Sequence, residues 1–223
     1  FRNKNIYKKL ITQSINFLRK EKIKLILIWP NENNLLPSMK ILNYQPIFSS
    51  SLLLLKINGI YSKIKINKNF INLNNNKNIF NKYKINKKTF TLLKDKNYLK
   101  KRYLLNPDNT FYSNELKLKS KKSKIIFKIM NNKIYIMDIL SESSLEDIHI
   151  KKFIKYFKNY NCSIFVLCNI YLPFYKILIL NGFIPSNHKF NSGFSLINKN
   201  KAKDELIKNL PYFNYSLGDT DVF

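Results

Sequence analysis

The chain has 223 residues and a net charge of +27, and its composition is 45% hydrophobic and 14% aromatic. This apolar content excludes an intrinsically disordered chain, despite the charge. No stretch reaches the roughly 18 to 20 uncharged apolar residues that a membrane-spanning helix needs. The length is enough for one large domain or two small ones with a buried core.

The positive charge comes almost entirely from lysine, with 37 Lys against three Arg. A pI near 10 is the electrostatic footprint of a nucleic-acid binder. Bidentate recognition of phosphate or guanine, however, favours the arginine guanidinium. Lysine mixed with asparagine is typical of codon drift in an AT-rich genome. We therefore expect weak, nonspecific attraction to polyanions and no specific nucleic-acid recognition.

Cysteine and histidine are scarce, with two of each. Cys162 and Cys168 lie six residues apart in a predicted strand, so both face one side, and we expect buried, reduced structural thiols. His149 and His188 are expected to be surface or capping residues. The polar, Lys-rich start is unlike a signal peptide, so a cytoplasmic location is expected. Because the chain opens on Phe1, we read it as a piece of a longer reading frame or a processed product.

The first part of the chain predicts the order helix, strand, helix, strand. Apolar residues at helical spacing over 5–22 indicate an amphipathic helix that packs one face on a sheet. The apolar run KLILIW over 24–29 is typical of a buried strand. Residues 35–42 predict a short Pro-containing helix, and residues 46–57 predict a second strand.

The middle of the chain predicts a linker followed by a hairpin. Residues 61–98 are rich in Lys and Asn and include a low-complexity stretch, which predicts a flexible linker or a surface excursion. Farther on, 124–130 and 133–140 predict two strands joined by a tight turn at Asn131-Asn132.

The second half repeats the order of the first. Ser144 predicts the cap of a helix whose first turn holds Glu146 and Asp147, both favourable to the helix dipole. A strand over 163–167, a Pro-containing helix over 173–180 and an extended region follow. The repeated order predicts two related modules. The expected buried stripe of the Ser144 helix is Ile148, Phe153, Ile154 and Phe157.

The repeated unit resembles the C-terminal half of a GNAT-type acyltransferase domain. In that family, a loop with the pattern R-x-x-G-x-G/A precedes the long helix and holds the pyrophosphate of acetyl-CoA. A helix N-terminus can do so because it offers unpaired N–H donors and the positive end of a dipole. The resemblance implies acyl-CoA as cofactor. The positions that would bind it are Arg2, Asn3, Lys4, Asn5 (where Gly is preferred), Ile6 and Asn31.

Three further stretches resemble a GNAT-like subfamily of bacterial polysaccharide-associated proteins. They are 28–44, similar to "PN-x-x-S … K-x-L-G-W/F" with Asn34 for Ser and Asn43 for Gly; 95–107, similar to "D-x-x-Y/F-L-x-W-R-Y-x-x-x-P" with Lys101 for Trp; and 210–223, similar to "W-Y-x-T-L-G-D-S-D".

The resemblance implies an α/β (α+β) fold of two GNAT-like mixed-sheet modules with flanking helices, the first one incomplete. Each long helix would lie beside a splayed pair of strands. The implied domains are the C-terminal half of a first module over 1–60, a Lys/Asn-rich linker over 61–90 and a second module over 91–223.

Transfer in this family is a direct attack of an amine on a thioester. It needs a base, an acid for the departing thiolate and N–H groups for the oxyanion. The acid is often a Tyr four residues before the Gly that follows the last helix. The matching positions hold Met39 and Leu178, which cannot donate a proton. The loop over 141–147 has no Gly or Arg and three acids, so we expect it to repel a pyrophosphate and expect any acyl-CoA site in the first module.

Two other groups of residues belong to the resembling stretches. Arg102 and Tyr103 lie in a Lys-rich run, where Arg102 could contact substrate or form a salt bridge to Asp219 or Asp221; we favour the bridge. The two aspartates are too few for a calcium or magnesium site, so we expect a turn that fixes the end of the chain and no metal.

The leading hypothesis is a GNAT-fold protein that transfers an acyl group from acyl-CoA to a small-molecule amine, on a sugar or an aminoacyl group. Its activity could be lost, and the oligomeric state is left open. A non-catalytic GNAT-fold binding or scaffold module is the second hypothesis. A basic RNA-associated protein of an AT-rich genome is the third.

Overall fold

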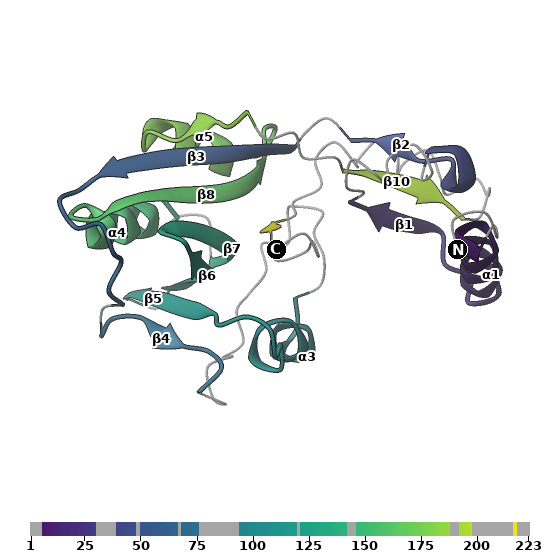
Figure 1. Ribbon diagram of the computed structural model, residues 1–223, viewed down its shortest axis with the longest axis horizontal. Helices are drawn as coiled ribbons and strands as arrows, with labels where there is room; N and C mark the ends of the chain where they lie inside the picture. Colours follow the sequence, from purple (N-terminus) through teal and green to yellow (C-terminus); the bar gives the residue numbers. More distant parts are fainter. Residues whose placement is uncertain are drawn as a thin grey trace. The chain divides into compact units, whose positions relative to one another are not determined.

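A computed structural model gives the structure of the protein (Figure 1). It describes residues 6–29, 39–47, 50–66, 68–75, 94–119, 121–141, 146–187, 192–197 and 216–217. Within these ranges the chain divides into two compact units, a smaller one from 6–50 and 192–197 and a larger one from 51–187 and 216–217. None of the described helices is long and apolar enough to cross a membrane.

The smaller unit contains a long helix and a three-stranded antiparallel sheet of order β1-β10-β2. The predicted helix is confirmed, and Ile11, Ile15 and Leu18 are half-buried along one side, whereas its apolar residues Leu10 and Phe17 are exposed. Ile47 and Phe194 form its small core. The elements are α1 (Ile6–Lys20), β1 (Leu25–Ile28), β2 (Gln45–Pro46) and β10 (Gly193–Leu196), and residues 39–42 are also helical.

The larger unit is a seven-stranded mixed sheet of order β4-β5-β6-β7-β8-β3-β9. β7 and β8 are parallel, whereas β4 through β7 and the β3–β9 pair are antiparallel. The elements are β3 (Ser50–Asn58), β4 (Ile71–Asn72), α3 (Lys96–Leu99), η2 (Lys100–Leu104), β5 (Tyr112–Leu118), β6 (Lys121–Met130), β7 (Lys133–Ser141), α4 (Glu146–Phe157), β8 (Asn161–Asn169), α5 (Pro173–Leu180) and β9 (Ile184–Pro185).

The core of the larger unit lies between α4 and one face of the sheet. Phe153 and Phe157 of α4 are fully buried against Ile125 and Phe127 of β6. The side chains of a strand alternate between its two faces. Lys124, Ile126 and Lys128 therefore lie on the opposite face of β6, which is the polar face of this sheet.

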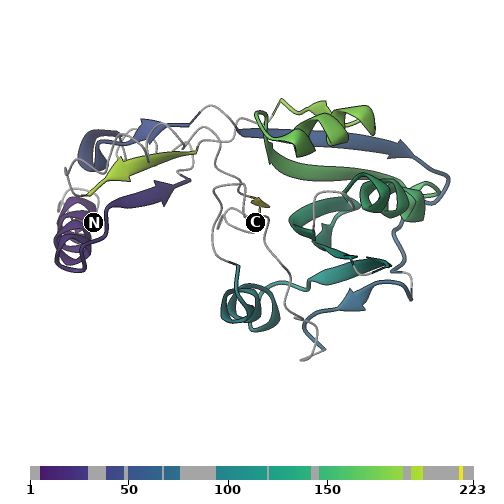
Figure 2. The same cartoon turned by 180° about the vertical axis from the view of Figure 1, so that it is seen from behind.

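Each half of the chain contributes one strand to the sheet that is otherwise formed by the other half. After α1, β1 and β2, the chain enters β3, which lies between β8 and β9 in the larger sheet. After α4, β8, α5 and β9, it enters β10, which lies between β1 and β2 in the smaller sheet. Both views of the larger unit show β3 running beside β8 (Figures 1 and 2). In each half of the chain, the elements of the predicted repeat are thus followed by a strand that pairs in the other sheet: β3 after the first set and β10 after the second.

The larger unit is therefore inserted into the smaller one. Its two ends are joined to each other, because Leu53 and Leu54 of β3 pair with Pro185 and Ile184 of β9, and Ser186 N–H donates to Leu52 C=O at 2.8 Å. The smaller unit is closed by contacts such as Ser192 Oγ to Ile47 C=O at 3.1 Å, across 145 positions of sequence.

The hairpin and the second long helix test the sequence predictions in detail. Asn131 and Asn132 both have positive φ, 48° and 58°. A two-residue hairpin turn whose twist matches that of its strands needs positive φ at both of its central residues. Phe153 and Phe157 are buried as predicted, but Ile148 is 39% exposed, and Ile150 is buried in its place. The helix is rotated from the expected stripe so that His149 also turns inward.

The expected linker over 61–90 differs from the structure in its first part. Residues 68–75 include β4 and two buried side chains, Phe70 and Leu73. The ring of Phe70 stacks on that of Phe157, with centroids 5.4 Å apart. Intermittent aromatic residues in a Lys/Asn-rich stretch therefore supply core contacts there. The remainder, 76–90, lies outside the described residues.

Because of the insertion, the stability of the smaller unit depends on the larger unit being folded, whereas the larger unit does not depend on the smaller one. With the larger unit unfolded, closing the smaller one across 145 positions would cost roughly 4 kcal/mol of chain entropy, which a folded insert with joined ends largely removes. We predict that Phe157→Ala, expected to destabilise the larger unit by about 3–5 kcal/mol, lowers hydrogen-exchange protection in both units. The matched change Phe194→Ala should lower protection in β1 and β10 alone. Protected β1 and β10 amides in a Phe157→Ala chain whose β6 and β7 exchange freely would contradict the dependence.

Candidate functional site

The strongest candidate site is the place where β7 and β8 part. The strands pair only from Lys133 with Ser163 to Ile136 with Val166. β7 continues to Ser141 and β8 to Asn169, so their carboxyl ends are not paired with each other. α4 begins directly beyond the end of β7. This is the splayed pair beside a long helix that the resemblance implies for the second module.

A β-bulge in β7 lies at the point of divergence. Phe127 of β6 is opposite Ile136, but Ile126 is opposite Asp138, so Met137 is an extra residue in β7. Because the side chains of a strand alternate, Asp138 would otherwise share the apolar face of Ile134 and Ile136. The bulge shifts the alternation by one residue and turns Asp138 to the polar face.

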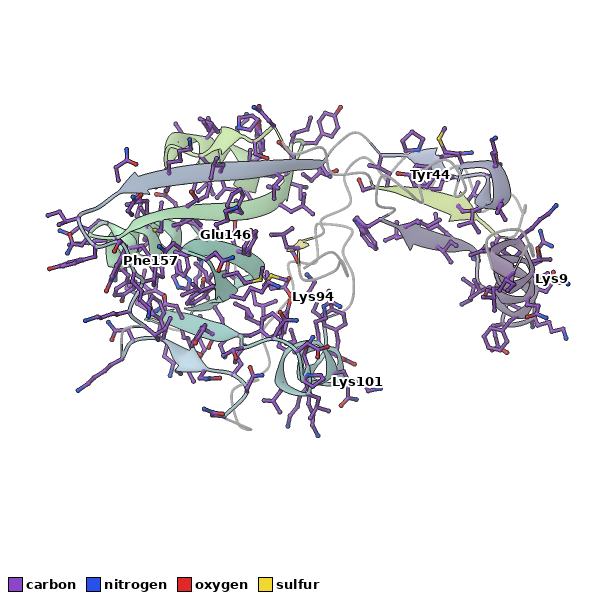
Figure 3. All side chains as sticks on the ribbon, viewed as in Figure 1. Lys9, Tyr44, Lys94, Lys101, Glu146 and Phe157 are labelled. Atoms are coloured by element: carbon purple, nitrogen blue, oxygen red, sulfur yellow. The ribbon has the colours of Figure 1, made fainter. Side chains whose placement is uncertain are left out.

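Asp138 is the centre of a buried polar cluster. Only 1% of it is exposed, and it accepts hydrogen bonds from Lys94 Nζ, Tyr103 Oη and Ser216 Oγ. Lys94 Nζ also donates to Ser216 Oγ at 2.9 Å. The cluster joins three distant parts of the chain beside the bulge (Lys94 is labelled in Figure 3).

A second carboxylate lies at the start of α4. Glu146 Oε1 accepts a hydrogen bond from Ser141 Oγ of β7 at 3.2 Å (Glu146 is labelled in Figure 3). Burial raises the pKa of Glu146. Burial, and to a lesser extent the charge of Glu146, raises the pKa of Cys168 on β8. Glu146 therefore interacts with the ends of both diverging strands, through a hydrogen bond with Ser141 of β7 and through its charge with Cys168 of β8.

Buried lysines and a buried histidine complete the polar groups around the sheet. Lys124 Nζ lies 3.6 Å from Glu115 Oε2, and burial lowers the pKa of Lys124 to about 8. On the α4 side, His149 Nδ1 accepts from Ser123 Oγ and Nε2 donates to Asn114 Oδ1 at 2.8 Å in the neutral ring. Burial lowers the pKa of His149 to about 4. The expectation of a surface or capping role for His149 is wrong, because it is 1% exposed.

The structure separates the predicted site residues. Ile6 is exposed at the start of α1. Tyr103 is fully buried in the Asp138 cluster, and Arg102 is half-buried on η2. Cys162 and Cys168 are buried and free, as expected. The predicted residues that lie outside the described parts of the chain are Arg2, Asn3, Lys4, Asn5, Asn31, His188, Asp219 and Asp221.

The sequence analysis missed Asp138, Lys94 and Ser216. Asp138 did leave a signal, since it is the one charged residue inside the apolar run IYIMDIL. Lys94 is one of many lysines in a Lys-rich stretch, so nothing in the sequence separates it from the others.

Comparison with known proteins identifies the fold. The sequence matches no protein-family model and no curated protein. Among solved structures, the chain is similar to a GCN5-related N-acetyltransferase from Anabaena variabilis ATCC 29413, with a TM-score of 0.58 and 13% identity. The match covers 89% of this chain and 52% of that protein, so this chain spans about half of its length. The chain therefore has a GNAT-like α+β fold, as the resemblance implies.

The residues of the larger unit fit only part of an acyl-CoA. Backbone groups of the diverging strands suit a chain that contains amides. The first turn of α4, however, holds two carboxylates, Glu146 and Asp147, where a pyrophosphate would need the positive end of the helix. Like charges at this position oppose binding of the phosphates. The described start of α4 therefore disfavours the phosphate end of the cofactor.

The ion pair of Asp138 should matter far more than an exposed one. Asp138→Asn removes the carboxylate charge that Lys94 contacts, and we expect a loss of about 3 kcal/mol in the free energy of unfolding. The matched change Asp147→Asn, in the exposed pair with Lys151 at 2.7 Å, should cost less than about 1 kcal/mol. Urea unfolding measures both. Equal losses would show that the Asp138 cluster is not a buried charged network.

His149 should make the protein less stable in mild acid. The pKa of His149 is about 4 when folded against an ordinary value of 6.5, so the unfolded chain takes up the proton first as the pH falls. Stability contributed by the neutral ring is complete above pH 6.5 and falls by about 3 kcal/mol towards pH 4. The raised pKa of Glu146 acts in the opposite sense, and comparison with His149→Gln separates the two. The difference between wild type and variant in unfolding free energy should shrink from pH 7.5 to pH 4.5; a constant difference would contradict a neutral buried His149.

Proposed function

We propose that this protein transfers an acyl group from a thioester donor to an amine acceptor on its GNAT-like scaffold. The observation that carries the proposal is the parting of β7 and β8 beyond Ile136 and Val166. Unpaired strand edges bind extended chains through backbone hydrogen bonds. The pantetheine arm that carries acyl groups as thioesters is an extended chain with two amides, so its shape and its polar groups suit this position.

The bulge at Met137 would supply the group that stabilises the developing negative charge. The extra residue of a bulge leaves the ladder, so its N–H need not be committed to β6. A backbone N–H that points at the acyl carbonyl stabilises the oxyanion formed when an amine attacks. Met137 is 1% exposed, and such a hydrogen bond is stronger where water is excluded.

Asp138 would hold the acceptor side of the site. Its carboxylate comes one residue after the bulge, on the polar face of the sheet, and is fixed by Lys94, Tyr103 and Ser216. An amine attacks a thioester carbonyl only in its neutral form, so it must lose a proton as the C–N bond forms, and the departing thiolate takes one up when the C–S bond breaks. The polar groups held around Asp138 would orient the amine beside the carbonyl by hydrogen bonds. An amine on a sugar or on an aminoacyl group remains the proposed acceptor.

We also propose that the two halves of the chain are related GNAT-like modules, of which the smaller unit is incomplete. The repeated element order and the exchanged strands β3 and β10 support this. A second donor site, separate from the one between β7 and β8, is proposed before α1, where Arg2, Asn3, Lys4, Asn5 and Ile6 with Asn31 would bind the phosphates of acyl-CoA. The acidic start of α4 disfavours those phosphates in the larger unit.

A non-catalytic binding module is the second candidate function. It is favoured by Leu178, which occupies the position of the expected acid and is fully buried in the core. A module of this kind would hold the same acyl-bearing arm between β7 and β8 without releasing a thiolate.

Calorimetry can test the donor assignment in the larger unit. In an Arg2→Ala/Lys4→Ala chain, we expect S-acetylpantetheine and acetyl-CoA to bind with affinities within about threefold, because the phosphates gain nothing at α4. Glu146→Gln should strengthen acetyl-CoA about fivefold, the effect of roughly 1 kcal/mol of repulsion in a partly screened site. The affinity for S-acetylpantetheine should stay unchanged.

Asp108→Asn, in a loop of the same unit, is the matched control and should change neither affinity. Absence of heat with both ligands in wild type and in the variants would contradict the proposed donor site. Acetyl-CoA bound more than thirtyfold tighter than S-acetylpantetheine in the Arg2→Ala/Lys4→Ala chain would place phosphate recognition in the larger unit after all.

A further inference from the structure

One side of α1 carries large apolar side chains that are exposed. The exposed fractions are 44% for Ile6, 57% for Leu10 and 61% for Phe17. Successive residues of an α-helix are turned by roughly 100° about its axis, so these three side chains lie within an arc of roughly 40°. They form a stripe that runs for about 16 Å along the helix. We call these three residues the α1 stripe.

The α1 stripe faces away from the contact that joins α1 to the small sheet. Arg19 Nε donates to the C=O of Ile197, directly after β10, at 3.4 Å. Around the helix axis, Arg19 lies roughly 140–180° from the residues of the stripe. The half-buried residues Ile11, Ile15 and Leu18 lie between the two sides. The attachment of α1 to its own unit therefore leaves the stripe exposed.

Cations border the α1 stripe on the side opposite to the half-buried residues. Lys9 is three residues after Ile6, and Lys20 is three residues after Phe17, so each lies beside the stripe on the helix surface (Lys9 is labelled in Figure 3). Both lysines are exposed. α1 as a whole contains four Lys or Arg and no acid. The exposed side of this helix is therefore apolar and positively charged at once.

An anionic lipid surface suits both properties. The apolar side chains of a helix that lies in the plane of a bilayer interface enter the acyl region, while its lysines reach the anionic headgroups. Such a helix lies on the membrane and does not cross it. With 15 residues, α1 is shorter than the roughly 20 residues that crossing requires.

Other partners would use only one of the two properties. The phosphates of a nucleic acid would contact the lysines and leave the apolar stripe in water. A second copy of the chain, meeting the same surface about a two-fold axis, would bring the lysines of both helices to one border. Because α1 has no acid to pair with them, these charges would repel each other.

We infer that α1 is a membrane-surface helix, which binds anionic lipid bilayers through the α1 stripe together with Lys9 and Lys20. The inference concerns the smaller unit and does not depend on acyl transfer in the larger one.

Co-sedimentation of the full chain with lipid vesicles tests the inference. We expect binding to phosphatidylcholine vesicles that contain about 30% phosphatidylserine, and much weaker binding to phosphatidylcholine alone. Leu10→Gln/Phe17→Gln should lower the partition coefficient roughly tenfold or more, because less apolar surface enters the bilayer. Glutamine keeps the helix propensity of these positions. Lys9→Gln/Lys20→Gln should lower it roughly tenfold or more and make the binding less sensitive to salt.

Matched controls lie in the larger unit. Leu180→Gln removes an apolar side chain of α5 that is 85% exposed. Lys155→Gln/Lys158→Gln removes two exposed lysines at the end of α4. Both should leave the partition coefficient within about twofold of wild type. Equal losses in the Lys9/Lys20 and Lys155/Lys158 variants would reduce the binding to the general charge of the chain and overturn the inference.

A folding defect is checked separately. The substituted residues of the α1 stripe are exposed, so hydrogen-exchange protection of β1 and β10 should be the same in Leu10→Gln/Phe17→Gln and in wild type. Vesicle binding that is unchanged in this variant would show that the stripe does not enter the bilayer and would contradict the inference.

Two further results would overturn the inference in favour of another occupant. The first is a wild type that ignores anionic vesicles but sediments as a dimer, which Leu10→Gln/Phe17→Gln converts to a monomer; a second copy then covers the stripe. The second is a wild type that ignores vesicles but binds poly(U) RNA, with weaker binding by Lys9→Gln/Lys20→Gln; the cations then serve a nucleic acid.

Discussion

The pairing of β3 with β9 is the interaction on which the rest of the architecture depends. It joins the first and last strands of the larger unit, at Leu53 with Pro185 and Leu54 with Ile184. The chain therefore leaves this unit close to where it entered, and β10 can return to the small sheet begun by β1 and β2. Without that closure, the three strands of the smaller sheet would have to come together across a long flexible loop.

The division of the larger sheet into two unlike faces follows from strand alternation and one irregularity. β6 sends Ile125 and Phe127 to the core under α4, and Lys124 and Lys128 to the other face. β7 would carry Asp138 into the apolar side if its alternation were regular. The extra residue Met137 prevents this, and the same residue marks the point where β8 departs. One local deviation thus turns a carboxylate to the polar face at the point where the two strands part.

Local patterns in the sequence predicted local structure well. The turn at Asn131-Asn132, the helix over 173–180 and the repeated element order all depend on neighbouring residues, and the structure has them. Strand exchange was not predictable, because pairing of β10 with β1 joins residues far apart in sequence. His149 was misplaced because apolar periodicity ignores a polar side chain that finds two buried partners. β5 was missed, since YSNELKL carries alternation too weak to separate from a loop.

The site is harder to predict than the fold because its parts come from separate segments and from backbone geometry. Asp138 could be suspected from the sequence because it is a lone charge in an apolar strand. The bulge that turns it to the polar face cannot be predicted from the residues around it. The central claim is that the parted ends of β7 and β8 hold an amide-containing acyl arm. Hydrogen exchange of residues 137–141 and 167–169, with and without saturating S-acetylpantetheine, measures this directly. The account predicts slower exchange there and unchanged exchange in β5; equal exchange with and without the ligand, at a concentration where calorimetry reports binding, would contradict it.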